Sequence, residues 1–325
     1  MQDFNGKIAV ITGGGTGMGR ELARQLVAEG CSVAMCDLSE ANMAETARLC
    51  SQEAPQGVKV TQHLADVSIE DQVNRFRDEV AQQQDTDKIH LLFNNAGIGG
   101  GGSFVTGGRG EWEKTFNVCW GGVYYGCRAF LPMLIKADEG HIINTSSVNG
   151  FWASLGPQTA HTAYSAAKFA VKGFTEALIN DLKLNAPHIK CSVVMPGHIG
   201  TDIAINSRKV LTGEDELSAE TLNNARAQMK RMGVAADQLT NDQIKAMVED
   251  QGRRFRDDAP TTAAAAAKIM IDAVKSETWR VLVGEDAQRM DEMVRADPAH
   301  AYEPGFFERM AGDTGWRLGG GARPG

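Results

Sequence analysis

Short apolar runs rich in β-branched residues alternate with helical segments along most of this 325-residue chain. Strands that are apolar along their whole length are typical of parallel sheets buried on both faces, where the intervening helices form the crossovers. The pattern therefore predicts an α/β fold with a doubly wound, parallel, seven-stranded sheet and helices on both faces. The predicted strands are residues 7–12, 31–37, 58–67, 88–97, 140–148, 189–197 and 278–284.

Two regions interrupt this alternation. Residues 200–258 are polar and charged, with helical stretches but no apolar strand, and we expect a helical lid over a site. Pro260 suits the first turn of the helix that follows. We therefore predict one catalytic domain over residues 1–284, which includes this insertion. Residues 285–325 form a predicted C-terminal extension, and we expect its last residues, GGGARPG, to be disordered.

Charge and cysteine usage exclude some classes of partner. The formal net charge is −8, which argues against nucleic acid because phosphate binding needs clustered Lys and Arg. The six cysteines form no C-x-x-C pair, and no Cys/His cluster has the spacing of metal ligands. We expect reduced, buried thiols and no metal site.

The start of the chain and its hydropathy bear on location. The N-terminal residues lead almost directly into a predicted strand, without the charged and apolar regions of a secretion signal. No apolar stretch approaches the length of a membrane helix. A cytoplasmic protein with no membrane partner is the expectation.

A glycine cluster, TGGGTGMG, joins the first predicted strand to the first helix. Gly13, Gly17 and Gly19 give the spacing T-G-x-x-x-G-x-G, which differs from G-x-G-x-x-G. Glycine lets the backbone turn tightly and lets a pyrophosphate approach a helix N-terminus, where free N–H groups favour an anion. The loop at this position indicates a dinucleotide site. A plain strand-to-helix turn is the alternative.

The second predicted strand ends at Asp37, about where a ribose-binding acid is expected after such a loop. A carboxylate there can accept both hydroxyls of the adenosine ribose and would repel a 2′-phosphate. Neither the loop nor the two residues after Asp37 supply a cation, and the nearest one is Arg20. We therefore predict NAD rather than NADP. The alternative role for Asp37 is to cap the next helix, which Ser39 could also do.

Tyr164 and Lys168 lie four residues apart in HTAYSAAKFAVKGF, which has a helical pattern. Positions i and i+4 lie on one face of a helix, so the two side chains should point the same way. An ordinary surface pair is the alternative. A free tyrosine has a pKa of about 10, and a neighbouring ammonium should lower it toward the range where acid–base catalysis is effective.

The glycine loop, NNAG at 94–97, TSS at 145–147 and YSAAK at 164–168 occur in this order. With this set the chain resembles the short-chain dehydrogenase/reductase family, in its single-domain branch with a Rossmann fold. The resemblance runs from Lys7 to about Thr201 and resumes near Pro260. It implies a catalytic tetrad: Tyr164 as acid/base, Lys168 as its partner, Ser147 to polarise the carbonyl, and Asn117 to complete a proton relay.

The same resemblance implies the residues that contact the cofactor. They come from the glycine loop, the ends of the strands, the catalytic helix and the segment PGHIGT. They are Gly13, Thr16, Gly17, Met18, Gly19, Asp37, Leu38, Asp66, Val67, Asn95, Ala96, Gly97, Tyr164, Lys168, Pro196, Gly197, Ile199 and Thr201.

The segment between Ser147 and Tyr164 is longer than is usual in the family, so Ser146 and then Ser154 are alternative catalytic serines. The additional residues should lie at the mouth of a substrate pocket, where Phe151, Trp152 and His161 could line it. For His161 a partly exposed loop position is favoured over a catalytic one. We assign no proton-transfer role to His198.

The predicted function is NAD-dependent interconversion of a secondary alcohol and a ketone, with a bulky, largely apolar substrate. Two alternatives stay open: an NADP-preferring carbonyl reductase, and a dinucleotide-binding protein without turnover. The resemblance also implies a homo-oligomer, a tetramer or dimer formed through the helices at 110–136 and 161–185.

Overall fold

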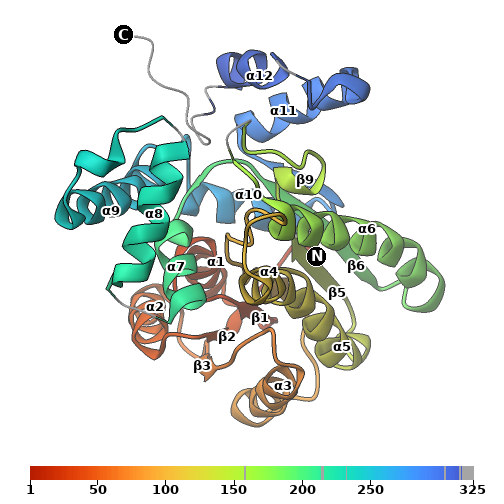
Figure 1. Cartoon of the computed structure of the whole chain (residues 1–325). Helices are drawn as coiled ribbons and strands as arrows, with labels where there is room; N and C mark the ends of the chain where they lie inside the picture. Colours follow the sequence, from red (N-terminus) through yellow and green to blue (C-terminus); the bar gives the residue numbers. More distant parts are fainter. Residues whose placement is uncertain (157–158, 214–215, 232, 304, 315, 317–325) are drawn as a thin grey trace.

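Seven strands form one parallel sheet in the computed structural model of this chain, which describes residues 1–156, 159–213, 216–231, 233–303, 305–314 and 316 (Figure 1). Their order is β3-β2-β1-β4-β5-β6-β9, and every pairing is parallel. The fold class predicted from the sequence is confirmed. The strands are β1 (Ile8–Thr12), β2 (Ser32–Asp37), β3 (Val60–Leu64), β4 (Leu91–Asn94), β5 (Gly140–Thr145), β6 (Ile189–Pro196) and β9 (Arg280–Val283).

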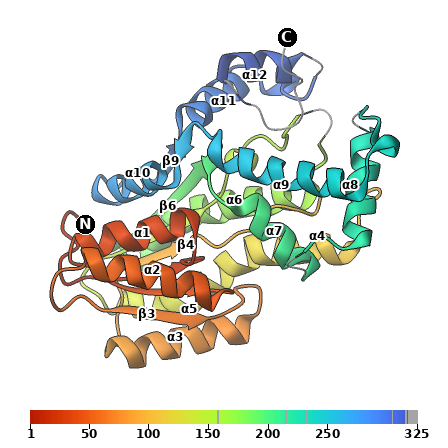
Figure 2. The same cartoon turned by 90° about the vertical axis from the view of Figure 1, so that its left-hand side faces the viewer.

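Helices cover both faces of the sheet, and each face has its own apolar core. One core packs α1 (Gly17–Ala28), α2 (Glu40–Glu53) and α10 (Ala263–Lys275) against the strands. The other packs α3 (Glu70–Gln84), α5 (Gly122–Ile135) and α6 (Thr162–Asn185), with α4 (Arg109–Phe116) leading into α5. Figure 2 shows α1 and α2 on the side of the sheet away from α5 and α6. The alternating residues of β1 illustrate the division, because Ile11 belongs to the first core and Val10 to the second.

The order of the strands reverses between β1 and β4. The chain moves outward from β1 through β2 to β3, and then returns to β4 on the other side of β1. At such a reversal the two connecting loops leave in opposite directions and open a crevice at the carboxyl ends of the strands, where ligands of open α/β sheets bind. The glycine loop after β1 and the NNAG segment after β4 both lie at this point.

Three helices form the predicted lid region. They are α7 (Ile203–Thr212), α8 (Ala219–Arg231) and α9 (Asn241–Asp257), and they stand beyond the carboxyl ends of the strands (Figure 2). Two short parallel strands, β7 (Ile199–Gly200) and β8 (Thr261–Thr262), pair at the base of the region. The expectation of a helix start at Pro260 is wrong, because β8 follows Pro260 and the Thr262 hydroxyl caps α10 by accepting the N–H of Ala265.

The C-terminal extension folds back onto the loop that follows β5. Its helices α11 (Glu285–Ala296) and α12 (Phe306–Thr314) enclose a third apolar cluster with Val148 and Trp152. The Trp152 indole donates to the carbonyl of Ala301 at 2.8 Å, and Trp152 is 1% exposed. The disorder expected for GGGARPG falls on residues outside the described part of the chain. None of the described helices has the length and apolar character needed to cross a membrane.

Candidate active site

The glycine loop has the geometry that its sequence predicts. Gly13 and Gly17 have φ angles of 69° and 54°, which side-chain-bearing residues rarely adopt. Gly19 is required for a different reason, since a Cβ there would lie 2.0 Å from the Gly13 carbonyl oxygen. The loop therefore closes tightly against the start of α1, and the first N–H groups of that helix stay available for an anion.

Asp37 braces this loop from the end of β2. Its Oδ2 accepts the N–H of Gly15 at 3.0 Å, and its Oδ1 accepts the N–H of Ser39 at 3.1 Å. Ser39 caps α2 by accepting the N–H of Asn42, so Asp37 is not the helix cap. A carboxylate has about four acceptor positions, and two of those of Asp37 remain for a ligand.

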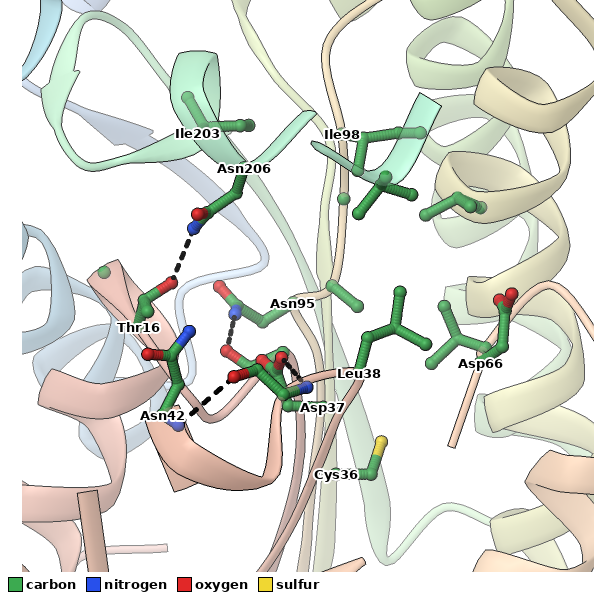
Figure 3. A pocket seen from close by; sticks show the side chains of 18 of the residues that line it. Thr16, Cys36, Asp37, Leu38, Asn42, Asp66, Asn95, Ile98, Ile203 and Asn206 are labelled. Carbon is green, nitrogen blue, oxygen red and sulfur yellow. Dashed lines mark hydrogen bonds between the residues drawn. The ribbon is translucent and has the colours of Figure 1, made fainter. Parts of the chain in front are cut away.

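A cavity of about 560 Å³ extends along the carboxyl ends of the strands, between the glycine loop and α7 (Figure 3). Twelve of the predicted cofactor residues line it. They are Gly13, Thr16, Gly17, Met18, Asp37, Leu38, Asp66, Val67, Asn95, Ala96, Gly97 and Thr201. Asn95 adds an unused acceptor, because its Oδ1 is buried without a hydrogen-bond partner. The cavity thus joins segments that are far apart in the sequence.

The other six predicted cofactor residues do not line this cavity. Pro196 and Gly197 continue the end of β6, where the N–H of Gly197 donates to the carbonyl of Val283. Ile199 is 5% exposed and packs in the core of the α1 face. Gly19 packs against Gly13, and Tyr164 and Lys168 lie beyond Gly97.

Ser147, Tyr164 and Lys168 come together from two elements. Ser147 follows β5, and its hydroxyl lies close enough to the phenol of Tyr164 on α6 to favour the phenolate. The Lys168 Nζ lies 5.3 Å from the centroid of the Tyr164 ring, as the i and i+4 spacing predicts. Lys168 is buried and donates to the carbonyl of Thr145 at 2.8 Å. A Cβ on Gly97 would lie 3.6 Å from this ammonium, so the pair adjoins the cavity.

The expected fall in the Tyr164 pKa is not what the protein environment alone produces. Burial raises the pKa of Tyr164 above its usual value, the Cys119 thiol adds to this, and the hydrogen bond from Ser147 opposes it. Burial also lowers the pKa of Lys168. Desolvation disfavours the charged form of each group, and it is the largest cause of both shifts.

The two alternative serines have structural partners. The Ser146 hydroxyl donates to the carbonyl of Lys168 at 2.7 Å, which fixes α6 to the end of β5. The Ser154 hydroxyl accepts the N–H of Gly156 within a turn. Of the three, Ser147 is the one that meets Tyr164.

Asn117 begins a π-helical turn, Asn117–Gly121, between α4 and α5. The carbonyl of Asn117 accepts the N–H of Gly122 there, and π-turns of this kind occur frequently at functional sites. Its side chain is exposed and makes no hydrogen bond to the side chains of Ser147, Tyr164 or Lys168 within the described ranges. The structure therefore does not bring Asn117 into direct contact with the other three.

The His161 ring packs against the acid/base candidate in a tilted arrangement. Its ring centroid lies 4.6 Å from that of Tyr164 with an angle of 38° between the planes. Burial lowers the pKa of His161 to about 4, so the imidazole is neutral at physiological pH. The expectation that Trp152 lines the substrate pocket is wrong, since its ring packs against Phe306 in the C-terminal cluster.

Sequence reasoning missed the contribution of α7 and of the C-terminal extension. Asn206 and Lys209 line the cavity from α7, and no motif marks them within a polar helix. Asp286 on α11 accepts the N–H of His198 at 2.7 Å and so fixes PGHIGT. The missed lining residues are Cys36, Ser39, Asn42, Ala65, Ile98, Val118, Ile203, Asn206, Lys209 and Val210.

Comparison with known families agrees with this architecture. The model of the family described as short chain dehydrogenase matches residues 7–212, which is more than half of the chain. The chain belongs to the short-chain dehydrogenase family. The match begins just before β1 and ends at the last residue of α7. The protein is thus an oxidoreductase of this family, and α8 to α12 lie beyond the matched part.

Relatives and solved structures extend the likeness. A Mycobacterium tuberculosis protein named as the oxidoreductase SadH is 36% identical over 241 residues, which are 74% of this chain and 84% of its own. Levodione reductase of Leifsonia aquatica is 31% identical over 220 residues, 66% of this chain and 78% of its own. The crystal structure of a short-chain dehydrogenase/reductase from Burkholderia phymatum in complex with NAD has a TM-score of 0.73 and 27% identity, covering 94% of this chain and 98% of that one.

Proposed function

We propose that this protein is an NAD-dependent oxidoreductase that interconverts a secondary alcohol and a ketone. The observation that carries the proposal is the meeting of Ser147, Tyr164 and Lys168 next to a cavity walled by the glycine loop. The Burkholderia phymatum structure contains NAD, and the Leifsonia aquatica relative is named for the reduction of levodione. The first of these supports a nicotinamide cofactor, and the second supports a carbonyl substrate.

The cavity fits a dinucleotide. The tight loop at Gly13 and Gly17 leaves helix N–H groups for a pyrophosphate, and the spare acceptor positions of Asp37 suit the ribose hydroxyls. Lys168 would hold the nicotinamide ribose, and PGHIGT would flank the nicotinamide. When bound, the oxidised cofactor supplies the hydride acceptor and the reduced cofactor the donor.

The three side chains divide the proton chemistry at the substrate oxygen. The Tyr164 phenolate takes the alcohol proton during oxidation, and the resulting phenol returns a proton to the ketone oxygen during reduction. Ser147 donates a hydrogen bond to the same oxygen and stabilises the negative charge that develops there. Lys168 places a positive charge beside the tyrosine, which stabilises the phenolate as it forms. We propose that Asn117 acts through its backbone at the π-turn.

Preference for NAD over NADP follows from the charges around the adenosine end. Asp37 would repel a 2′-phosphate, and Leu38 beside it carries no charge. The guanidinium of Arg20 is occupied by the carbonyl of Gly15 at 2.6 Å and the hydroxyl of Thr46 at 3.0 Å. The hydrogen bonds of Arg20 therefore stabilise the loop conformation, and the guanidinium is poorly placed to bind a 2′-phosphate.

We further propose a bulky, largely apolar substrate, with residues 1–284 as one catalytic domain, 200–258 as its lid and 285–325 as an extension. Apolar side chains that are at least partly exposed lie in the glycine-rich loop before α4 and on the adjoining end of α7. Phe104 and Val105 are 75% and 91% exposed in the glycine-rich loop before α4, and Leu211 of α7 approaches Gly100. Ile203 and Val210 also give α7 apolar side chains toward the cavity, which suits such a substrate.

We also propose that the protein forms a homo-oligomer and that it is located in the cytoplasm. The helices α5 and α6 expose Tyr124 and Phe169 to 40% and 43%, and aromatic residues are enriched at protein interfaces. The six cysteines are buried free thiols, as a reducing compartment favours. Light scattering during size-exclusion chromatography should give a dimer or tetramer, and a monomer would contradict this part.

The test is turnover with a panel of secondary alcohols and ketones, from small to steroid-sized, followed by the absorbance of NADH. Wild type should react with NAD, whereas Tyr164→Phe should bind NADH with an unchanged Kd and lose turnover. Activity retained in Tyr164→Phe would refute the assignment. Binding of NADH without turnover of any compound would favour a non-catalytic dinucleotide-binding protein.

A further inference from the structure

Charge is distributed unevenly around the cavity. Among the described residues that line it, the acidic ones are Asp37 and Asp66 and the one basic residue is Lys209. Asp37 accepts backbone N–H groups of its own wall, and Asp66 Oδ1 accepts from the N–H and hydroxyl of Ser68. A dinucleotide brings two negative charges on its pyrophosphate, and a cation in the cavity wall would stabilise them. Among the described lining residues, α7 carries the one that could do so.

Asn206 lies one turn before Lys209 on the same helix and also lines the cavity. Its side-chain Nδ2 donates to the Thr16 hydroxyl oxygen at 3.3 Å, across the gap between α7 and the glycine loop (Figure 3). Thr16 is the N-cap residue of α1, but its side chain accepts no N–H from that helix. Because the Thr16 oxygen accepts from Asn206, its O–H remains a donor near the helix N-terminus.

Further contacts fix α7 over the cavity. The Ser207 hydroxyl accepts the N–H of Gly99 at 2.8 Å, and the Lys114 ammonium of α4 donates to the carbonyl of Val210 at 2.6 Å. With the bond from Asn206 to Thr16, three segments outside the lid hold this helix. A ligand between α1 and α7 would therefore be enclosed from both sides.

We propose that α7 forms the second half of the phosphate site, with Lys209 supplying the counter-charge and Asn206 orienting Thr16 toward the pyrophosphate. This inference rests on the proposed function, since it assumes a dinucleotide in the cavity. The N-terminus of α1 carries only about half a unit charge, so the lysine provides the larger share. Release of the cofactor then requires α7 to separate from the glycine loop. Because salt screens the attraction between the Lys209 ammonium and the pyrophosphate, cofactor affinity should fall as salt increases.

Binding measurements on the full-length protein test this directly. The Kd of NADH and of ADP-ribose, and the dissociation rate of NADH, would be measured by fluorescence and calorimetry at low and high salt. ADP-ribose contains the pyrophosphate but no nicotinamide. Lys209→Gln should raise both Kd values about three- to tenfold at low salt, as expected for one lost charge-assisted contact, and should reduce the salt dependence. Asn206→Ala should increase the NADH dissociation rate by a similar factor.

Lys245→Gln is the matched control, because this lysine lies on α9 of the same lid and does not line the cavity. It should bind both ligands as the wild type does, and thermal unfolding verifies that all variants are folded. Wild-type Kd, dissociation rate and salt dependence in Lys209→Gln and Asn206→Ala would overturn the inference while leaving the proposed function intact. If the wild type bound neither NADH nor ADP-ribose, both proposals would fail.

Discussion

The Asp286 carboxylate contacts the peptide that joins Gly197 to His198, and its Oδ2 accepts the His198 N–H at 2.7 Å. The contact is close enough that a Cβ on Gly197 would lie 2.3 Å from the same oxygen. His198 in turn donates from Nε2 to the carbonyl of Phe255 at the end of α9. The C-terminal extension, the PGHIGT segment and the lid are thus connected through two residues.

Asp286→Ala should therefore weaken both the fold and cofactor binding. It leaves the buried N–H of His198 without an acceptor, which costs about 1–3 kcal/mol of unfolding free energy. The displaced segment should raise the Kd of NADH. Asp286→Asn keeps an acceptor oxygen and should recover most of both losses. Chemical denaturation and NADH titration provide the measurements.

Asp291 on the same helix is the control for this prediction. It is also buried, but it pairs with Arg280 and Arg295 away from the PGHIGT segment. Asp291→Asn should lower the unfolding free energy and leave the Kd of NADH unchanged. Equal effects of the two Asp→Asn substitutions on the Kd would show that Asp286 acts only through general stability.

Cofactor preference should respond to a single cation beside Asp37. Leu38 is 48% exposed and lines the cavity, so Leu38→Arg can reach a 2′-phosphate. One charge-assisted contact should raise the ratio of kcat/KM for NADP to that for NAD by about tenfold. Leu64→Arg is the control, since Leu64 is 49% exposed and does not line the cavity. A ratio that rises equally in both variants would contradict the assignment of this end of the cavity.

His161 should affect the pH profile of kcat/KM by covering the ring of Tyr164, and its own ionisation should have no effect on that profile. Its pKa of about 4 lies below the working range, so His161→Phe should leave the form of the kcat/KM profile unchanged. His161→Ala exposes one face of Tyr164, lowers the pKa of the phenol, and should move the tyrosine-dependent limb to lower pH. A limb that disappears in His161→Phe would instead identify His161 as a proton-transfer group.

The sheet and the glycine loop could be predicted because local sequence determines them. Continuous apolar runs such as residues 8–11 have few alternatives to a buried strand, and Gly13 and Gly17 have few functions other than a tight turn. The spacing of Tyr164 and Lys168 places them on one helix face by geometry alone. Motif residues on regular elements therefore kept their predicted positions.

The contacts of residues 200–258 and 285–325 were not predicted, because they join positions that are far apart in the sequence. Asn206 lies 190 positions from Thr16, and no local pattern indicates that the two meet. Trp152 was expected at a pocket, yet α12 supplies an apolar partner more than 140 residues later. The same limit applies to the pKa of Tyr164, where spacing predicts the lysine but only the fold determines how deeply both groups are buried.

Acid should destabilise the protein through its buried histidines, of which His141 in β5 is the clearest. It is 1% exposed, and its Nε2 lies 2.7 Å from the hydroxyl of Ser192, which itself donates to the carbonyl of Thr278. That hydroxyl must accept from a protonated Nε2, so the ring is a neutral donor. Burial is the main cause that lowers the pKa of His141 to about 3, with the positive N-terminus and Lys190 contributing.

The direction of the effect follows from proton binding. A histidine whose pKa is depressed by folding binds fewer protons in the folded state, so stability is full above the unfolded pKa of about 6.5 and falls as pH decreases toward 3. At pH 5 this histidine alone should cost about 2 kcal/mol of unfolding free energy. Chemical denaturation between pH 7 and 4.5 should show the loss, and His141→Gln should reduce its slope. Asp297 raises the pKa of the exposed His300, so His300→Gln should steepen the slope instead. An unfolding free energy that stays constant from pH 7 to 5 in the wild type would contradict the prediction.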